Sequence, residues 1–311
     1  MNMEQFTLKD HFERDMHCFK WSPATRPIAI VQIIHGMAEH AARYDDFARF
    51  LTNHGFVVFC SDLRGHGTTV GVVDKTGFFS YYNGWKIVSE NVYQLTSIAS
   101  KQYPELPLFL FGHSMGSLLA RTYMTKHKSI LKGVILSGTS YTPRLMLGFG
   151  KLIAVIQKKI KGYKYRSQLL DKLSFGSFNN KFKPARTKFD WLSRDEKQVD
   201  KYINDDFCGF VCTASLFLDL FNGISLIQSK SHLKSLAANL PIYLFSGEMD
   251  PVGDFTKGVK KVASLYKKHG AKDVEMKFYK GGRHEMLNEI NKQEVYQDVL
   301  DWIMKKIDVG S

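Results

Sequence analysis

The chain has 311 residues, of which 44% are hydrophobic, 13% aromatic and 23% charged. This composition is that of a folded globular protein and excludes collagen, low-complexity disorder and a small disulfide-stapled domain. The length suits two domains, or one large α/β domain with an insertion. The net charge is +13, and residues 144–190 contain twelve basic residues against two acidic ones. Most of the basic excess therefore belongs to one segment, which suits an anionic partner or simply solubility.

Neither the N-terminal residues nor the most apolar stretch of the sequence predicts a targeting signal or a membrane-spanning segment. The first fifteen residues contain no apolar stretch, which predicts that a signal peptide is absent. The most apolar window, Leu145–Ile160, is broken by glycines and lysines and falls short of a membrane span of about 20 residues. The cysteines lack CxxC or zinc-type spacing and predict reduced thiols in a cytoplasmic protein; they are Cys18, Cys60, Cys208 and Cys212.

Short apolar runs alternate with helical patterns over most of the chain. In the first part, strands are predicted at 28–34, 56–60, 108–111 and 133–136, with helices at 43–54, 84–101 and 115–126. The alternation resumes with strands at 242–245 and 274–279 and helices at 256–269 and 292–305. Continuous β-branched and aromatic runs are typical of strands covered by helices on both faces. The pattern predicts an α/β fold with a mostly parallel, doubly wound sheet.

Residues 143–232 break this alternation. The segment is basic and mostly helical in pattern, and we interpret it as an insertion packed over one end of the sheet. The predicted organisation is a core of residues 1–142 and 233–311 with a helical cap of residues 143–232. No internal repeat of 20–50 residues is visible.

The most informative motif is G-x-S-x-G at residues 112–116, with Ser114 at its centre. It follows a predicted strand directly and precedes a predicted helix. A serine on such a strand-to-helix turn is exposed at the end of the sheet, and the flanking glycines let the two segments pass closely. The helix N-terminus also aims N–H groups at an anion formed beside the hydroxyl. Ser114 is therefore the predicted nucleophile.

A serine nucleophile needs a histidine base, and the base needs an orienting acid. In nucleophile-elbow hydrolases the chain order is serine, acid, histidine. We assign the base to His284 because it lies in a loop after the last predicted strand, at the carboxyl end of the sheet. The other histidines beyond the serine are better explained as surface or cap residues; they are His127, His232 and His269.

Three carboxylates follow the strand at 242–245, and any of them could be the acid. We favour Asp250 because the proline after it holds the backbone extended away from the sheet. Glu248 follows the glycine turn closely, and Asp254 is interpreted as the N-cap of the next helix.

The oxyanion of an acyl-transfer intermediate needs two backbone donors. The amide after the nucleophile, Met115, supplies one, and a loop after an early strand should supply the other. The loop His35–His40 fits this position, with the Met37 amide as donor. We interpret the side chains of His35, Glu39 and His40 as loop scaffolding. They do not predict a metal site, because no helix places them on one face and further ligands are not evident.

The combined motifs resemble the monoacylglycerol lipase and lysophospholipase branch of the α/β-hydrolase superfamily, which is often grouped with the serine aminopeptidase-like hydrolases. The similar stretches are HGMAEHAARYDDFARFL, SDLRGHG, FGHSMGS, SGEMD and GGRHEMLNE. The resemblance implies a Ser114–Asp250–His284 triad, an oxyanion hole at Met37 and Met115, and a helical cap over the site. It also implies a structural turn at residues 62–67. Many relatives have glycine at Ser117, a difference that we expect to be minor.

The start of the cap is basic and apolar at the same time. Residues 144–166 carry seven basic residues, no acidic one and a dense set of apolar side chains. Two interpretations remain open: a helix lying in an anionic interface, or a helix whose apolar face packs on the sheet while its lysines are solvated. The run at 210–221 is either an acyl-tunnel lining or ordinary core.

The resulting hypothesis is a serine hydrolase that cleaves the carboxylic ester of a single-chain acyl lipid, a monoacylglycerol or a lysophospholipid. It needs no metal or organic cofactor, and it predicts a cytoplasmic protein with peripheral contact to anionic membranes through the basic cap. The alternatives are a short-chain carboxylesterase, an amide or aminopeptidase-type hydrolase, and a non-catalytic lipid-binding protein. Nucleic acid is not a predicted partner, because no helix-turn-helix, RNP or zinc pattern accompanies the charge.

Overall fold

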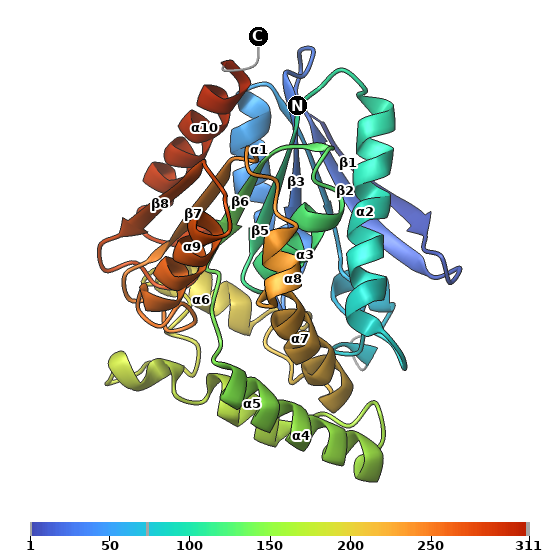
Figure 1. Cartoon of the computed structure of the whole chain (residues 1–311), viewed down its shortest axis with the longest axis vertical. Helices are drawn as coiled ribbons and strands as arrows, with labels where there is room; N and C mark the ends of the chain where they lie inside the picture. Colours follow the sequence, from blue (N-terminus) through green and yellow to red (C-terminus); the bar gives the residue numbers. More distant parts are fainter. Residues whose placement is uncertain (1, 73–74, 309–311) are drawn as a thin grey trace.

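The computed structural model describes residues 2–72 and 75–308, which form one eight-stranded sheet with helices packed on it (Figure 1). The strands are β1 (Asn2–Lys9), β2 (Asp15–Ser22), β3 (Ala29–Ile34), β4 (Phe56–Ser61), β5 (Leu108–His113), β6 (Leu131–Ser137), β7 (Ile242–Gly247) and β8 (Val274–Tyr279). Their spatial order is β1-β2-β4-β3-β5-β6-β7-β8. The pairs from β4 to β8 are parallel, and β2 is antiparallel to both its neighbours. The predicted α/β-hydrolase fold is confirmed.

Helices cover both faces of the sheet. Helices α1 (Asp45–Asn53) and α10 (Lys292–Asp308) lie on one face, and α2 (Gly84–Gln102), α3 (Met115–Lys126) and α9 (Lys257–Lys268) lie on the other. Successive side chains of a strand point to opposite faces. Every residue of β3, β4, β5 and β7 is consequently buried, which explains their continuous apolar sequences.

The predicted strands and core helices are confirmed, with ends that differ by at most three residues. The helix expected at 43–54 begins as a 3-10 turn, η1 (Ala41–Tyr44), before α1. The hairpin of β1 and β2 is not predicted from the sequence. β1 is an edge strand whose residues are all exposed or half-buried, so it carries no apolar run that would mark it as a strand.

The segment between β6 and β7 is largely helical. It contains α4 (Arg144–Lys161), α5 (Gln168–Phe175), η4 (Phe178–Lys181), α6 (Glu196–Ile203), α7 (Ala214–Ile227) and α8 (Lys230–Lys234). Helix α7 packs on α2, α3 and α4, and its Gly223 lies directly against the Trp85 ring. Most of the apolar side chains of α7 belong to the main core, in agreement with the core interpretation of residues 210–221. We propose that residues 143–232 are the cap.

Helix α4 lies at the outer edge of this segment (Figure 1). Many of its apolar side chains are exposed. Leu145 is 87% exposed and Ile160 is 75% exposed, and the buried residues of the helix are only Leu147 and Ala154 among those described. The exposed side chains recur three or four residues apart and form one face: Leu145, Phe149, Leu152, Ile156 and Ile160. The helix nevertheless buries Leu147 and Ala154 in the main core and packs on α7. The packing interpretation therefore holds for that face, with α7 as the partner, and an anionic interface at the exposed stripe stays a prediction. Within residues 2–72 and 75–308, no helix is long and apolar enough to cross a membrane.

Candidate active site

Ser114 lies on the sharp turn between β5 and α3. Its backbone has φ 51° and ψ −120°, a conformation that residues with a side chain rarely adopt. The Ser114 N–H donates to the Ser137 carbonyl at 2.9 Å, and the Ser117 hydroxyl donates to the Ser114 carbonyl at 2.6 Å. Strain of this kind persists only where neighbouring contacts hold it, and it gathers at functional sites. The turn presents a half-buried serine at the carboxyl edge of the sheet.

Two glycines make this turn possible. A Cβ atom on Gly112 would clash with the Gly116 carbonyl, and one on Gly116 would clash with the Ile34 carbonyl. Helix α3 therefore begins in direct contact with the end of β3. The G-x-S-x-G spacing is explained by this close packing, as the motif predicts.

His284 and Asp250 are hydrogen-bonded to each other, and both are buried. The distance between His284 Nδ1 and Asp250 Oδ1 is 3.0 Å, and the same Asp250 oxygen accepts the Val252 N–H at 2.9 Å. Their loops leave the adjacent strands β7 and β8 and are joined by the Met249 N–H, which donates to the Gly282 carbonyl at 2.9 Å. A carboxylate that accepts from Nδ1 leaves Nε2 as the basic nitrogen.

The His284 ring also lies close to the end of β5, next to Ser114. Its centre is 4.7 Å from the centre of the His113 ring. His113 in turn lies 3.1 Å from the Ser137 hydroxyl at the end of β6. The predicted nucleophile, acid and base thus come from the carboxyl ends of β5, β7 and β8, where ligands bind in open α/β sheets.

The surroundings of the two histidines change their pKa values in opposite directions. Burial lowers the pKa of His284, but the nearby Asp250 carboxylate, with Glu285 and Glu39 farther away, outweighs this effect and leaves it raised. Burial, together with the neighbouring His284, lowers the pKa of His113 to about 4. The His113 ring is therefore neutral near pH 7, and His284 is the more basic imidazole of the pair.

The other candidate acids are exposed, and the other candidate histidines contact residues outside the proposed triad. Glu248 and Asp254 are exposed, and the N-cap of α9 is Thr256, so the predicted N-cap role of Asp254 is wrong. The remaining histidines contact residues away from the turn: His127 stacks on Tyr93, His232 bonds the Arg121 carbonyl, and His269 bonds the Leu265 carbonyl.

The loop after β3 approaches the serine turn closely. A Cβ atom on Gly36 would lie 3.3 Å from the Ser114 Cβ. The Gly36 N–H donates to Glu39 Oε1 at 2.5 Å, and His35 Nε2 accepts the Leu63 N–H at 2.9 Å. The other ring nitrogen of His35 therefore donates to the Gly36 carbonyl at 2.7 Å. These contacts agree with a scaffolding role for His35 and Glu39.

The two amides expected to form an oxyanion hole differ in their surroundings. The Met37 amide has no acceptor among the residues described, and the residue after it, Ala38, has a positive φ of 56°. The Met115 amide opens α3, where the first N–H groups have no partner within the helix. Both amides are therefore available to an anion, and their joint use as an oxyanion hole stays a prediction.

A buried ion cluster behind the site is missed by the sequence analysis. Arg43 pairs with Glu39 at 2.8 Å and with Glu285 at 2.6 Å, and all three are almost completely buried. Burial raises the pKa of Glu285, but Arg43 outweighs this effect and lowers it to about 2. Glu285 follows His284, so Arg43 joins the loop after β3 to the histidine loop. The sequence offers one signal that could have predicted part of this cluster, the four-residue spacing of Glu39 and Arg43.

The cap contacts the histidine loop through its backbone. The His284 N–H donates to the Trp191 carbonyl at 3.3 Å, and the Glu285 N–H donates to the Leu192 carbonyl at 2.8 Å. The Trp191 and His284 ring centres are 5.3 Å apart. The predicted base is thus held from the cap side as well as by Asp250.

The turn at residues 62–67 makes structural contacts. The Asp62 carboxylate accepts the Ala41 N–H at 2.8 Å and the Thr68 N–H at 2.7 Å. Arg64 pairs with Asp10 at 2.8 Å. These bonds tie the turn to η1 and to the end of β1, which agrees with the structural role that the resemblance implies.

The side chain of His40 contacts the cap. Its Nε2 lies 2.7 Å from Asp205 Oδ2, and Cys208 lies next to both. Sequence analysis finds no further metal ligand beside His40, because these partners lie far along the chain. All four cysteines, including Cys208, are free and buried.

Comparison with known families settles the classification. The family model for serine aminopeptidase S33 matches residues 25–291, which cover the sheet from β3 onward, the cap and the histidine loop. The chain belongs to the serine aminopeptidase S33 family. The match includes each predicted site residue, from Met37 to His284.

Proteins that are similar to this chain include lipases and a carboxyl esterase. Human monoglyceride lipase is 27% identical over 295 residues, which are 94% of this chain and 87% of that protein. The monoacylglycerol lipase of Mycolicibacterium smegmatis is 27% identical over 290 residues, 92% of each protein. The crystal structure of a thermostable carboxyl esterase from Bacillus coagulans, in complex with glycerol, superposes with a TM-score of 0.91 at 27% identity over 99% of both chains. The chain lies in the monoacylglycerol lipase-like branch of the α/β hydrolases.

Proposed function

We propose that this carboxylic ester hydrolase cleaves the ester of a single-chain acyl lipid, a monoacylglycerol or a lysophospholipid, at a lipid surface. The observation that carries the substrate class is the outward apolar face of α4, which is flanked by lysines. The similarity to monoglyceride lipases from human and M. smegmatis supports the same class.

In the proposed reaction Ser114 is the nucleophile and His284 the general base. His284 Nε2 removes the proton from the Ser114 hydroxyl as the oxygen attacks the ester carbonyl. Asp250 holds the imidazole by its 3.0 Å bond and stabilises the imidazolium that forms. The imidazolium then gives its proton to the departing alcohol. Water, deprotonated by the same nitrogen, then attacks the acyl-enzyme. As the bond between the acyl carbon and the Ser114 oxygen breaks, the imidazolium returns its proton to that oxygen and the fatty acid is released.

The negative charge of both tetrahedral intermediates falls on the former carbonyl oxygen. We assign its stabilisation to the Met37 and Met115 amides, of which the second lies at the positive end of α3. The contacts of Gly36 with Glu39 and His35 fix the loop before the substrate arrives. Donors that are fixed in advance need no reorganisation during the reaction.

The cap surface provides a route to lipid aggregates. The neighbouring helix α5 also exposes two apolar side chains, Leu169 and Leu173. Contiguous apolar patches on a soluble surface mark sites of interaction. A basic helix with such a face lies in the plane of an anionic interface with its apolar side chains inserted. We propose that α4 and α5 dock on anionic membrane surfaces, which would place the cap at the source of the substrate.

The reaction and the acyl preference are tested together with a p-nitrophenyl ester series from acetyl to palmitoyl. We expect the rate to peak at medium or long chains and to be lost in Ser114→Ala. The matched control is Ser97→Ala on α2, whose hydroxyl bonds only the Tyr93 carbonyl among the described residues, and it should retain the wild-type rate. Monoacylglycerols and lysophospholipids, compared at equal acyl length, then distinguish the two head groups.

The alternatives give different results in the same experiment. A peak at acetyl esters, or a preference for aminoacyl amides, would contradict the lipid substrate and favour a short-chain esterase or aminopeptidase. A non-catalytic lipid-binding protein would show no ester hydrolysis and no labelling by a fluorophosphonate probe. Stoichiometric labelling that is lost in Ser114→Ala would exclude it.

A further inference from the structure

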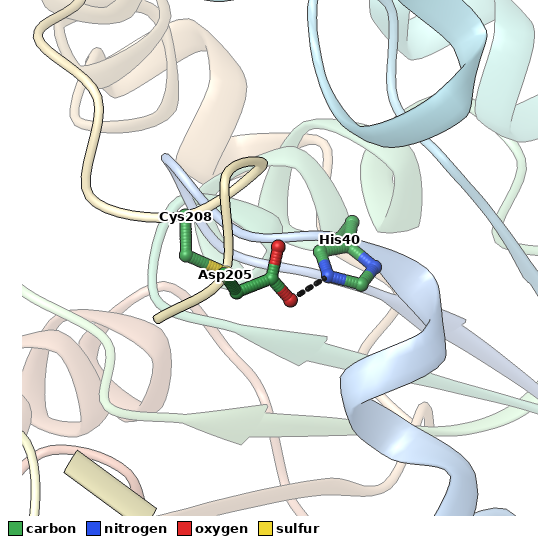
Figure 2. Close-up of side chains that lie close together, drawn as sticks. All are labelled: His40, Asp205 and Cys208. Atoms are coloured by element: carbon green, nitrogen blue, oxygen red, sulfur yellow. Dashed lines mark hydrogen bonds and ion pairs between the residues drawn. The ribbon is translucent and has the colours of Figure 1, made fainter. Parts of the chain in front are cut away.

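Three metal-binding side chains meet where the cap contacts the loop after β3, as Figure 2 shows. His40 comes from that loop, and Asp205 and Cys208 come from the connection between α6 and α7. His40 Nε2 lies 2.7 Å from Asp205 Oδ2, and the ligand atoms of the three residues all lie within 4.8 Å of one another. One imidazole nitrogen, one carboxylate oxygen and one thiol sulfur are a donor set that Zn²⁺ binds.

Two of these residues, Asp205 and Cys208, lie on one tight backbone turn. The Cys208 N–H donates to the Asp205 carbonyl at 2.9 Å, and the Phe207 N–H donates to Asp205 Oδ1 at 2.9 Å. The next residue, Gly209, donates its N–H to the Ala38 carbonyl at 3.0 Å. This last bond fixes the turn against the loop that carries His40, so the three ligands are brought together before any ion binds.

The donor atoms have room for an ion after a small adjustment. A tetrahedral Zn²⁺ site with bonds of about 2.0 Å to nitrogen and oxygen separates those atoms by roughly 3.3 Å. The His40–Asp205 pair at 2.7 Å therefore has to open slightly. The Cys208 thiol is buried and makes no side-chain hydrogen bond among the described residues, so it loses no partner. Asp205 is 31% exposed, which leaves a fourth position open to water.

The surrounding charges also favour a cation. The Arg43 guanidinium opposes one, since its charge acts on both Asp205 and Cys208. Glu39 and Glu285 pair with Arg43 at 2.8 and 2.6 Å. With Asp205 included, three carboxylates face one guanidinium, and the local balance is negative.

We propose that His40, Asp205 and Cys208 bind one Zn²⁺ ion, with water as the fourth ligand. Binding forms a bond between zinc and the Cys208 sulfur and releases the thiol proton to solvent. The ion would fasten the cap to the loop that carries Met37. The opposing interpretation is that His40 and Asp205 form only a hydrogen bond between cap and core, with Cys208 beside it by chance.

The test uses the untagged full-length chain, stripped of metal by a chelator and titrated with Co²⁺ as a spectroscopic probe for zinc. We expect a cobalt–thiolate absorption band that saturates at one equivalent and disappears when Zn²⁺ is added. Cys208→Ser should lose the band and bind Zn²⁺ at least about tenfold more weakly, and His40→Gln should bind at least about tenfold more weakly while keeping a thiolate ligand. The absence of a saturable band in the wild type would overturn the proposal.

The matched control is Cys212→Ser, which changes a second buried cysteine of the cap outside the cluster. It should keep the band at one equivalent. Zn²⁺ should raise the thermal unfolding temperature of the wild type and of this control, but not that of Cys208→Ser. Equal shifts in all three proteins would contradict the proposal. The same titration on Ser114→Ala separates metal binding from hydrolysis, so either idea can fail without the other.

Discussion

At the scale of single residues, the bond between His284 and Asp250 determines the pH at which the proposed base becomes active. The carboxylate raises the pKa of His284 even though burial alone would lower it. A protonated imidazole cannot accept the Ser114 proton. The rate should therefore fall as the pH falls through the pKa of His284, at a pH above the ordinary histidine value of about 6.5.

Asp250→Asn should reverse this effect. The asparagine removes the attraction of the carboxylate for the imidazolium but leaves the ring buried, so the pKa of His284 should fall below its ordinary value. The loss of the correct tautomer should also reduce kcat by about 10⁴-fold. The measurements are an NMR titration of the His284 ring and the pH profile of kcat/KM. Asp254→Asn, an exposed change on the same loop, should leave both unchanged, and an unshifted His284 titration in Asp250→Asn would contradict the assignment.

Arg43 is predicted to stabilise the fold rather than to contact substrate. Arg43→Met leaves the buried carboxylates of Glu39 and Glu285 without a cation, which should reduce the free energy of unfolding by about 3–5 kcal/mol. The pKa of Glu285 is lowered in the folded protein, so its stabilising contribution is present at neutral pH and is lost as the pH falls toward about 2. The difference in the free energy of unfolding between Arg43→Met and the wild type should therefore become smaller at acidic pH.

Urea unfolding at neutral and acidic pH measures this difference. Arg49→Met is the matched control because it removes an exposed ion pair with Asp45 on the neighbouring helix turn. Exposed pairs contribute about 0–1 kcal/mol. If Arg43→Met lost as little unfolding free energy as the control, the stability of the buried cluster would not depend on its cation.

The same residues show how much of the site the sequence could predict. Ser114, Asp250 and His284 each follow a strand that the apolar pattern marks, so their place at one sheet edge can be inferred. Arg43 and Glu285 are 242 positions apart, and no local pattern relates them. Asp205 and Cys208 beside His40 depend likewise on how the cap folds back onto the core. Contacts of this kind arise from tertiary packing, and the spacing of residues in the sequence does not predict them.

At the scale of elements, burial decides which strands could be predicted. β3, β4, β5 and β7 are buried on both faces and read as unbroken apolar runs. β1 lies at the sheet edge and alternates only weakly between exposed and half-buried residues, so its sequence resembles a loop. For α4 the sequence shows the apolar residues but not which face the protein covers, and that choice depends on its contact with α7.

Two helical glycines give a prediction about close packing. In Gly116→Ala the new methyl group would clash with the carbonyls of Ile34 and His35, which should destabilise the fold by about 1–3 kcal/mol and displace the serine turn. Gly148 lies in α4 with no neighbouring atom within 4 Å of an added Cβ. Gly148→Ala should therefore stabilise the protein by about 0.5–1 kcal/mol.

Thermal or urea unfolding and ester hydrolysis measure both variants. We expect Gly116→Ala to lose stability and activity together, whereas Gly148→Ala should keep its activity. If Gly116→Ala behaved like Gly148→Ala, the close approach of α3 to β3 would not be needed to form the turn.

At the scale of the whole molecule, we expect the uneven charge to orient the protein toward an anionic surface. The charge-reversal variant replaces four lysines with glutamate: Lys158, Lys159, Lys161 and Lys164. Its affinity for anionic liposomes, measured by sedimentation, should be at least about 100-fold weaker, since each lysine near such a surface contributes about 1 kcal/mol to binding. Added salt should weaken wild-type binding as well. Zwitterionic liposomes should show little dependence on either change.

The matched control reverses four exposed lysines of α9, on the core: Lys260, Lys261, Lys267 and Lys268. It changes the net charge equally but lies on a different element from the apolar stripe of α4. Equal losses in both variants would mean that overall charge, and not the α4 surface, attracts the liposomes. Unchanged sedimentation of the α4 variant would leave those lysines as solubilising residues.

The backbone contacts between the cap and the histidine loop constrain how this protein can be re-engineered. Trp191 and Leu192 hold His284 and Glu285 by their carbonyls, and Arg283 and Glu289 of the same loop bond residues 190–194 in return. A chimera that exchanges the whole cap for that of a relative would remove this support from the proposed base along with the cap helices. Exchanges confined to α4 and α5 leave residues 190–194 in place, so the proposed membrane docking and the catalytic competence should be separable by the choice of junction.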